Sequence, residues 1–391
     1  MEVVYRCCCG IDVHKKVIVA CLVNGGEQEL REFGTTTSEI KTLANWLTES
    51  GCEMIAMEST GVFWKPLYNL FELMDLDAMI VNAAHMKALP GRKTDVKDAE
   101  WIADLLRHGL LKASYIPNRE QRELREITRY RKSLTEERCR EVNRLQKILE
   151  GANIKLDSVV KDITGKSAEV SKMVHGRMRP KLEQIVASIE GITTPLQRKL
   201  LAQIIDHIDD LNRRIGELDK LVQEYMAEYE AAIEAIDEIP GIARRSAEVI
   251  LAEIGLDMGR FPSAAHLCSW AGVCPGNYQS AGRRKHGKTT KGNKALKTIL
   301  TQCAKSAKTV KSSYFFAQYQ RISARRGKNR ATLAVAHSML IAIYHILKNK
   351  TAFHDLGSDY YDSFNRDRKI NSYLKRLKAL GWEPDAIPSS A

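Results

Sequence analysis

The first hundred residues alternate between strand-like and helix-like patterns, and this alternation limits the possible folds more than any other feature. Val3–Val13 and Val17–Val23 are predicted strands that are close enough to pair as a hairpin, and Arg31–Thr35 is a candidate third strand. The segments that follow are a helix over Ser38–Thr48, a strand over Met54–Met57, a helix over Phe63–Met74, a strand over Ala78–Val81 and a helix over Val96–Leu111. Hairpin strands followed by alternating strands and helices predict an α/β unit with a mixed sheet covered by helices.

Residues 119–235 are charged and have helical periodicity. Six apolar residues follow the alternating three-and-four spacing of a coiled-coil seam: Ile208, Leu211, Ile215, Leu218, Val222 and Tyr225. Gly165, Gly176 and Pro180 interrupt the pattern, so we expect two long helices around an irregular insert. An intramolecular helical hairpin and an intermolecular dimerisation arm both satisfy this pattern.

A third, all-α region begins after Ile236. Its predicted helices are Ala243–Ile254, Ser263–Trp270, Asn293–Thr309, Thr332–Leu347 and a short amphipathic Lys369–Leu380. The expected domains are therefore residues 1–115, 116–235 and 236–391.

The net charge of +12 favours a polyanionic partner, which is a nucleic acid or an anionic lipid surface. The longest apolar stretch, Met339–Leu347, is too short to cross a bilayer, so no membrane is expected. None of the nine cysteines forms a C-x-x-C pair, which is typical of free thiols in a reducing cytoplasm.

Four acids stand where a sheet of this kind brings strand ends together. Asp12 and Glu58 each close an apolar strand, and Asp95 and Asp98 lie three residues apart at a helix start. Carboxylates gathered at one point need a counter-charge, which Mg²⁺ or Mn²⁺ supplies with hard oxygen ligands. Taken separately, Asp95 and Asp98 are more simply interpreted as helix-start acids favoured by the helix dipole, and Glu58 is consistent with a turn residue.

The Gly10-Ile11-Asp12 strand also resembles the opening of actin-like ATPases. That class places a phosphate-binding Gly-Thr pair after the acid, whereas Val13 to Lys16 follow here, which disfavours it. The chain has no G-x-x-x-x-G-K-[ST] loop either.

A loop rich in turn formers and cations spans residues 271–288. Ser280 is a candidate nucleophile, and Tyr278 is a rival because tyrosine also forms covalent links to DNA. His286 is the one nearby candidate base in sequence. The candidate phosphate contacts are Arg283, Arg284, Lys285, Lys288 and Lys291. A turn serine in a solvated cationic loop is the simpler interpretation.

Upstream, Glu238 to Ala243 contains a Pro240-Gly241 turn of the kind found in a helix-hairpin-helix, where backbone N–H groups contact a phosphate. The usual second glycine is Ala243 here, so a simple helix–helix turn is the alternative.

Together these motifs resemble the DEDD-type insertion-sequence transposases, the bridge-RNA-guided recombinases. The N-terminal matches are Gly10–Asp12, Met57–Gly61 and Lys93–Ala99, and the C-terminal matches are Ile239–Ile242, Trp270–Gly272, Tyr278–Ser280 and Thr290–Asn293. The motifs occur in the family's order over nearly the whole chain. Ser280-Ala281-Gly282 replaces the Ser-Gly of many members, and residues 153–179 resemble a longer middle found in part of the family.

The resemblance implies a ribonuclease-H-like (RuvC-like) domain in which Asp12, Glu58, Asp95 and Asp98 bind Mg²⁺. It implies that Ser280 forms a transient phosphoserine link to DNA, beside the tetrad of another protomer in a dimer of dimers. It further implies a structured non-coding guide RNA that pairs with donor and target DNA. The alternatives are a hydrolytic junction resolvase, a non-catalytic nucleic-acid scaffold and an actin-like ATPase.

Overall fold

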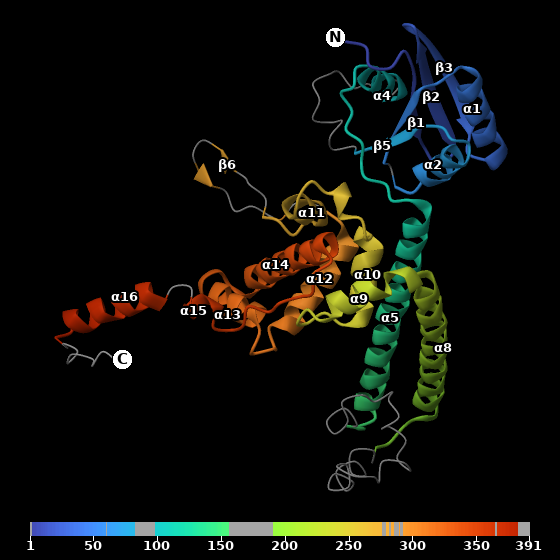
Figure 1. The fold of residues 1–391 in the computed structure, drawn as a ribbon. Helices are drawn as coiled ribbons and strands as arrows, with labels where there is room; N and C mark the ends of the chain where they lie inside the picture. Colours follow the sequence, from blue (N-terminus) through green and yellow to red (C-terminus); the bar gives the residue numbers. More distant parts are fainter. Residues whose placement is uncertain are drawn as a thin grey trace. The chain divides into compact units, whose positions relative to one another are not determined.

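A computed structural model describes residues 2–59, 61–82, 98–155, 191–275, 279–280, 283–284, 289, 292–363 and 366–381. The chain divides into two compact units, Met1–Asn118 and Arg119–Ala391 (Figure 1).

Unit 1 is a five-stranded sheet with helices on both faces. Its elements are β1 (Cys7–Val13), β2 (Val17–Asn24), β3 (Glu27–Gly34), α1 (Thr37–Glu49), β4 (Met54–Glu58), α2 (Trp64–Leu73), β5 (Ala78–Val81) and α4 (Asp98–Arg107). The strand order is β3-β2-β1-β4-β5, with β1, β2 and β3 antiparallel and β1, β4 and β5 parallel. This confirms the predicted mixed sheet and fits a ribonuclease-H-like α/β fold.

Alternate residues of β1 face the two layers. Cys9, Ile11 and Val13 pack in the core formed with α1 and α2, whereas Cys8 packs in a second core with α4. Gly10 lies under α4, where an added Cβ would stand 2.3 Å from the backbone nitrogen of Ala103. Only glycine allows this helix to approach the strand so closely.

Two strand boundaries differ from the sequence prediction. β1 begins at Cys7 rather than Val3, because Val3 and Val4 are exposed and the Val4 N–H donates to the Arg107 carbonyl at 2.9 Å. β3 begins earlier than predicted and exposes six mostly polar residues in a row, as suits a sheet edge protected from pairing with other chains. Its charged sequence carries little of the apolar signal that marks a strand.

Unit 2 is mainly helical. Its elements are α5 (Arg119–Gly151), α8 (Pro195–Tyr225), η3 (Ala227–Tyr229), α9 (Glu230–Asp237), α10 (Arg244–Ile254), η4 (Met258–Arg260), α11 (Ala264–Ala271), β6 (Gln279–Ser280), β7 (Arg283–Arg284), α12 (Lys294–Ala307), α13 (Tyr314–Arg326), α14 (Lys328–Asn349), α15 (Tyr360–Ser363) and α16 (Arg366–Ala379).

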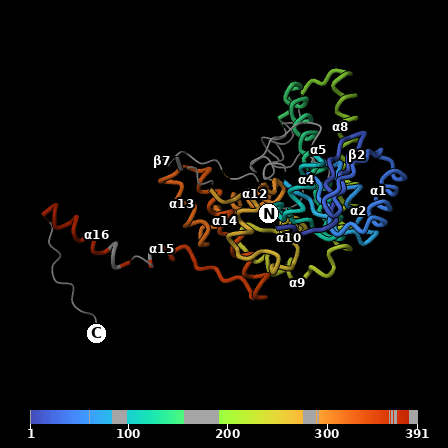
Figure 2. Tube along the Cα trace, turned by 90° about the horizontal axis from the view of Figure 1, so that it is seen from above, coloured from blue at the N-terminus to red at the C-terminus, as the bar shows by residue number. Residues whose placement is uncertain are grey.

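The helices α5 and α8 form an antiparallel pair within the chain (Figures 1 and 2). Leu134 packs against Leu211 and Ile215, and further along α5 Leu145 packs against Ile208. Thr194 caps α8 in a reciprocal capping box with Gln197, and Pro195 opens the helix. The intramolecular hairpin is thus present, and the insert between the helices, residues 156–190, lies outside the described residues. An added role in dimerisation stays a prediction.

Helices α9, α11, α12 and α13 pack around α14. This helix is long and apolar enough to satisfy the length and composition expected of a membrane span. Its apolar residues are accounted for by the core, because Val335, Met339 and Ile343 are fully buried among α10, α11, α12 and α13. Helix α13 was not expected from the sequence, and its short buried face includes Gln318, hydrogen-bonded to the Ser338 hydroxyl at 2.8 Å.

All nine cysteines are free, as the sequence predicted. Burial raises the pKa of Cys8 and of Cys52 to about 12, so both thiols are protonated at neutral pH. These side chains act as small apolar groups in the core of unit 1.

Candidate active site

The structure brings Asp12 and Glu58 to the same edge of the sheet. β1 and β4 are parallel neighbours with Ile11 opposite Met57, so the next residue of each strand is one of these acids. Side chains alternate along a strand, and Cys8 and Ala56 of the same parity pack in the α4 core. Asp12 and Glu58 therefore end their strands on the face that α4 covers.

The start of α4 lies at this same edge. The helix runs antiparallel to β1, because the Arg107 carbonyl accepts from Val4 while the Ala103 carbonyl lies 3.8 Å from the Cys8 sulfur. The other end of α4, with Asp98 as its first residue, therefore lies toward the carboxyl end of β1. Three of the four predicted acids thus share one end and one face of the sheet, and Asp95 lies outside the described residues.

Asp12 already has a partner. Its Oδ2 lies 3.0 Å from Nε2 of His14, whose side chain is 63% exposed while that of Asp12 is 13% exposed. His14 follows β1 in the tight turn to β2, where its N–H donates to the Val17 carbonyl at 2.9 Å. A histidine two residues after the acid was visible in the sequence, but the pairing depends on the turn.

The donor chemistry at this edge fits a hard divalent cation. Asp12, Glu58 and Asp98 are all partly buried and supply oxygen ligands, which Mg²⁺ and Mn²⁺ prefer. Within the described part of the chain, no three acids, histidines or cysteines are grouped closely enough to hold a metal ion by themselves. A complete site therefore needs a further ligand, and Asp95 is the candidate from the sequence.

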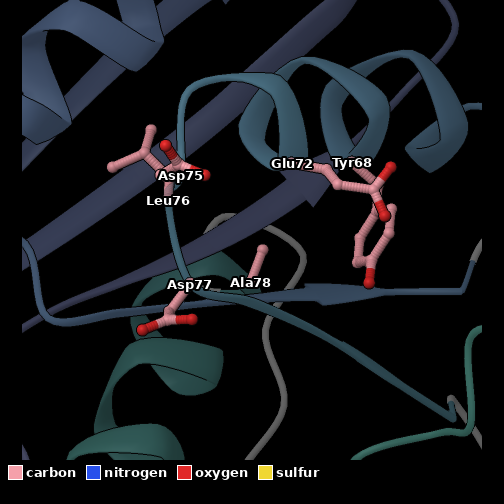
Figure 3. A pocket seen from close by; sticks show the side chains of 6 residues that line it. All are labelled: Tyr68, Glu72, Asp75, Leu76, Asp77 and Ala78. Carbon is pink, nitrogen blue, oxygen red and sulfur yellow. The ribbon is translucent and has the colours of Figure 1, made fainter. Parts of the chain in front are cut away.

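A second group of acids lies elsewhere in unit 1. Glu72, Asp75 and Asp77 line a hollow of about 340 Å³ between the end of α2 and the start of β5 (Figure 3). Ala78 begins β5, so this hollow is at the amino end of the strand, opposite the edge marked by Glu58 and Val81. It is distinct from the candidate active site.

Ser280 is placed by a short antiparallel pair in unit 2. The backbone register pairs Ser280 with Arg283 and Gln279 with Arg284. At the base of the same loop, Pro275 bridges Thr289. The side chains of these paired residues, together with Tyr278, Lys285, His286, Lys288 and Lys291, lie outside the described residues, so their predicted roles stay predictions.

The loop closes against α11. An added Cβ on Gly292 would lie 2.4 Å from the backbone nitrogen of Gly272, so the two backbones touch. Gly272 ends α11 in the left-handed conformation, with φ of 74°. The two ends of the loop that carries Ser280 are therefore fixed next to each other.

A fully buried carboxylate, which was not predicted from the sequence, anchors this base. Arg129 donates two hydrogen bonds of 2.7 and 2.8 Å to the Glu253 carboxylate, and Asn293 donates a third of 2.6 Å. Asn293 also caps α12 through the Leu296 N–H. The only sequence signal is an acid inside the apolar run of α10, and its cationic partner lies 124 residues away on α5.

Gly241 lies in the turn between α9 and α10, with φ of +89°. An added Cβ would stand 2.4 Å from the Ala307 nitrogen, so close packing on α12 requires glycine here. This packing does not test the predicted contact of the turn with a phosphate, which stays a prediction.

An acidic strand-edge site on a ribonuclease-H-like sheet defines a class of nucleic-acid-cutting and recombining proteins. Comparison with known families agrees: residues 9–154 match the DEDD transposase family of the IS110 type, and residues 233–320 match the transposases of the IS116/IS110/IS902 family. The two matches cover both units in order. The chain belongs to the IS110 family of DEDD transposases.

Three relatives carry names consistent with this. A protein of Sinorhizobium fredii (strain NBRC 101917 / NGR234) named as a transposase is 25% identical over 308 residues, 75% of this chain and 70% of the relative. A protein of Pseudomonas aeruginosa named as a family 20 transposase is 21% identical, covering 77% and 85%. The insertion element IS110 43.6 kDa protein of Streptomyces coelicolor is 27% identical, covering 68% and 73%.

Proposed function

We propose that this transposase cuts and rejoins donor and target DNA through a covalent phosphoserine intermediate at Ser280, with Asp12, Glu58, Asp95 and Asp98 holding Mg²⁺ or Mn²⁺. The observation that carries the proposal is the placement of Asp12, Glu58 and Asp98 at the same end of the same sheet face. Three carboxylates gathered near a DNA phosphate are unfavourable unless a cation neutralises them.

The acids act by holding the cation in a fixed place. A bound divalent ion supplies charge neutralisation for the reacting phosphodiester. Asp12 and Glu58 are fixed by adjacent strands and Asp98 by a helix packed directly on Gly10, so the oxygens keep their spacing without reorganisation. The His14 contact lies on one oxygen of Asp12, and it leaves the carboxylate with further lone pairs for an ion.

In the proposed step, Ser280 Oγ forms a bond to phosphorus as one phosphorus–oxygen bond of the DNA strand breaks. The serine proton passes to a base or to water, and the released sugar oxygen takes up a proton. The reverse reaction joins a new DNA end to the same phosphate, so no ATP is consumed. In the described residues, Gly292 and Asn293 anchor the C-terminal end of the segment that contains Ser280.

The remaining parts of the proposal rest on the family resemblance. These are a structured guide RNA that pairs with donor and target DNA, and a dimer that assembles into a tetramer in which one protomer's acids act with another's serine. The α5–α8 hairpin is the proposed pairing element, and residues 236–391 the proposed serine domain.

Trapping a protein–DNA adduct tests the chemistry. The full chain is incubated with Mg²⁺, the element's flanking RNA and a junction DNA, then resolved on a denaturing gel. We expect an adduct in the wild type and in Tyr278→Phe, and none in Ser280→Ala. Metal-dependent cleavage that survives Ser280→Ala without an adduct would instead establish the alternative, a hydrolytic junction resolvase.

A further inference from the structure

The charges of unit 2 are distributed very unevenly along the chain. No aspartate or glutamate occurs between Asp257 and Asp355, although this acid-free segment contains 18 lysines and arginines. The whole chain has a net charge of only +12, so the rest of the sequence is net negative. Such a segment is a strong attractor of polyanions.

The cations of the α5–α8 hairpin provide a contrast. Arg213 pairs with Asp210 and Glu217 at 2.6 Å each, and Arg214 pairs with Asp210 at 2.7 Å. The α5–α8 hairpin is therefore charged but internally neutralised, and these two arginines already have carboxylate partners.

The corner between α13 and α14 has no such compensation. Arg325, Arg326 and Lys328 are exposed around the Gly327 junction, and no carboxylate in the described part of the chain pairs with them. The two helices lie side by side (Figure 1), so their cations meet at this end. We call these three residues the basic corner.

The helix dipole accounts for the position of only some of the cations in the basic corner. Cations are favoured at a helix C-terminus, so Arg325 and Arg326 suit the end of α13. Lys328 lies in the first turn of α14, where an acid would be favoured, and that turn contains none. A cation held in an unfavourable place beside two others is better accounted for by a ligand than by folding.

We propose that the basic corner binds the phosphate backbone of nucleic acid, as a second contact surface separate from the loop that carries Ser280. The aromatic neighbour supports this chemistry: the Arg321 guanidinium, one turn before Arg325, stacks over the Tyr361 ring at 5.2 Å. Arginines and aromatic rings together are typical of nucleic-acid surfaces. The inference rests on the proposed function only in taking nucleic acid as the polyanion.

The test is the salt dependence of binding by the full chain, measured by fluorescence anisotropy without Mg²⁺. The probes are a random-sequence DNA duplex and an RNA hairpin of equal length. The triple variant Arg325→Ala/Arg326→Ala/Lys328→Ala should lower the slope of log K against log salt by about three, because each cation that is removed neutralises one phosphate. Affinity near 0.1 M salt should fall about 10-fold or more.

A matched control removes the same charge elsewhere. Lys199→Ala/Arg213→Ala/Arg214→Ala on α8 should leave the slope within about one unit of the wild type, because two of these side chains are already paired. The single variant Lys328→Ala should weaken binding while leaving thermal stability unchanged or higher, which separates binding from folding.

Weaker binding of the DNA probe, the RNA probe or both supports the proposal and identifies the nucleic acid. Equal changes in the corner and control variants would overturn it. Ser280→Ala should bind as the wild type does, so failure of adduct formation and failure of this surface are distinguished from each other. A wild type that binds neither probe would overturn the basic corner as a phosphate-binding surface, whereas adduct trapping at Ser280 is a separate test of the proposed function.

Discussion

The two units differ in the charged side chains that they place at their surfaces. Unit 1 collects carboxylates at the carboxyl ends of β1 and β4, partly buried and held by the sheet. The acid-free segment of unit 2 has none, and its basic corner stands exposed where two helices meet. A DNA phosphate is repelled by the first region and attracted by the second. Under the proposed function, this difference separates the carboxylates that would hold the metal ion, in unit 1, from the cations that would bind phosphates, in unit 2.

The largest expected effect is that of Asp12→Ala, which should abolish DNA cleavage but leave DNA binding intact. Asp12→Ala should reduce cleavage at least about 1000-fold, since the loss of a metal-holding carboxylate is worth several kcal/mol. Its affinity for DNA without Mg²⁺ should stay the same or rise slightly, because a negative charge is removed. A gel assay of junction cleavage and anisotropy binding on the same preparations measure both. A parallel loss of binding would contradict the division between the two regions.

Glu253 is an exception to this contrast between the units, because it is a fully buried acid in unit 2, just before the acid-free segment. Glu253→Ala leaves Arg129 and Arg125 without their carboxylate and should lower the free energy of unfolding by about 3 kcal/mol. Urea unfolding followed by circular dichroism gives the value. Glu123→Ala, which removes an exposed ion pair with Arg119, should cost less than about 1 kcal/mol. Equal costs would show that the Glu253 network does not anchor the helices.

Gly10→Ala tests how α4 positions Asp98. The added methyl would stand 2.3 and 2.4 Å from backbone atoms of Ala103 and Ala99, so the helix has to shift. We expect a loss of about 2 kcal/mol in unfolding free energy, the range for overpacking. Cleavage at a temperature where the variant is fully folded should also fall. Gly216→Ala, on α8 with no neighbouring atom near the added methyl, should leave cleavage unchanged.

The parts of this arrangement that could be predicted from sequence are those set by local pattern. The acids Asp12 and Glu58 end apolar runs, and parallel strands place such ends together, so their shared edge followed from the strand assignment. The role of Gly10 could not be predicted in this way, because it depends on the close approach of α4, a helix far from β1 in sequence. Contacts of that kind are tertiary and leave no periodic signal.

The features that were missed or only partly predicted share a physical cause. β3 is a charged edge strand of which only the last residues were predicted, α13 buries a polar Gln318, and Glu253 is an acid within an apolar helix face. In each, the burial pattern is set by a partner outside the segment itself, which overrides local hydrophobicity. The predicted acids instead follow a local pattern, in which an acid comes at the end of an apolar strand.

The smallest expected effect is that of Asn329→Asp, which tests why the acid-free segment contains no acid. Asn329 is exposed in the first turn of α14, where an aspartate would interact favourably with the helix dipole. Asn329→Asp should therefore stabilise the protein by about 0.5 kcal/mol and yet weaken nucleic-acid binding about threefold, since it places a negative charge beside Lys328. Gln203→Glu, an equal change of charge on α8, should leave affinity unchanged. Differential scanning calorimetry and anisotropy would measure the two quantities. A variant that is more stable but binds nucleic acid more weakly would show that the absence of acids favours ligand binding and not folding. A variant that is more stable and binds equally well would show that the basic corner does not contact nucleic acid.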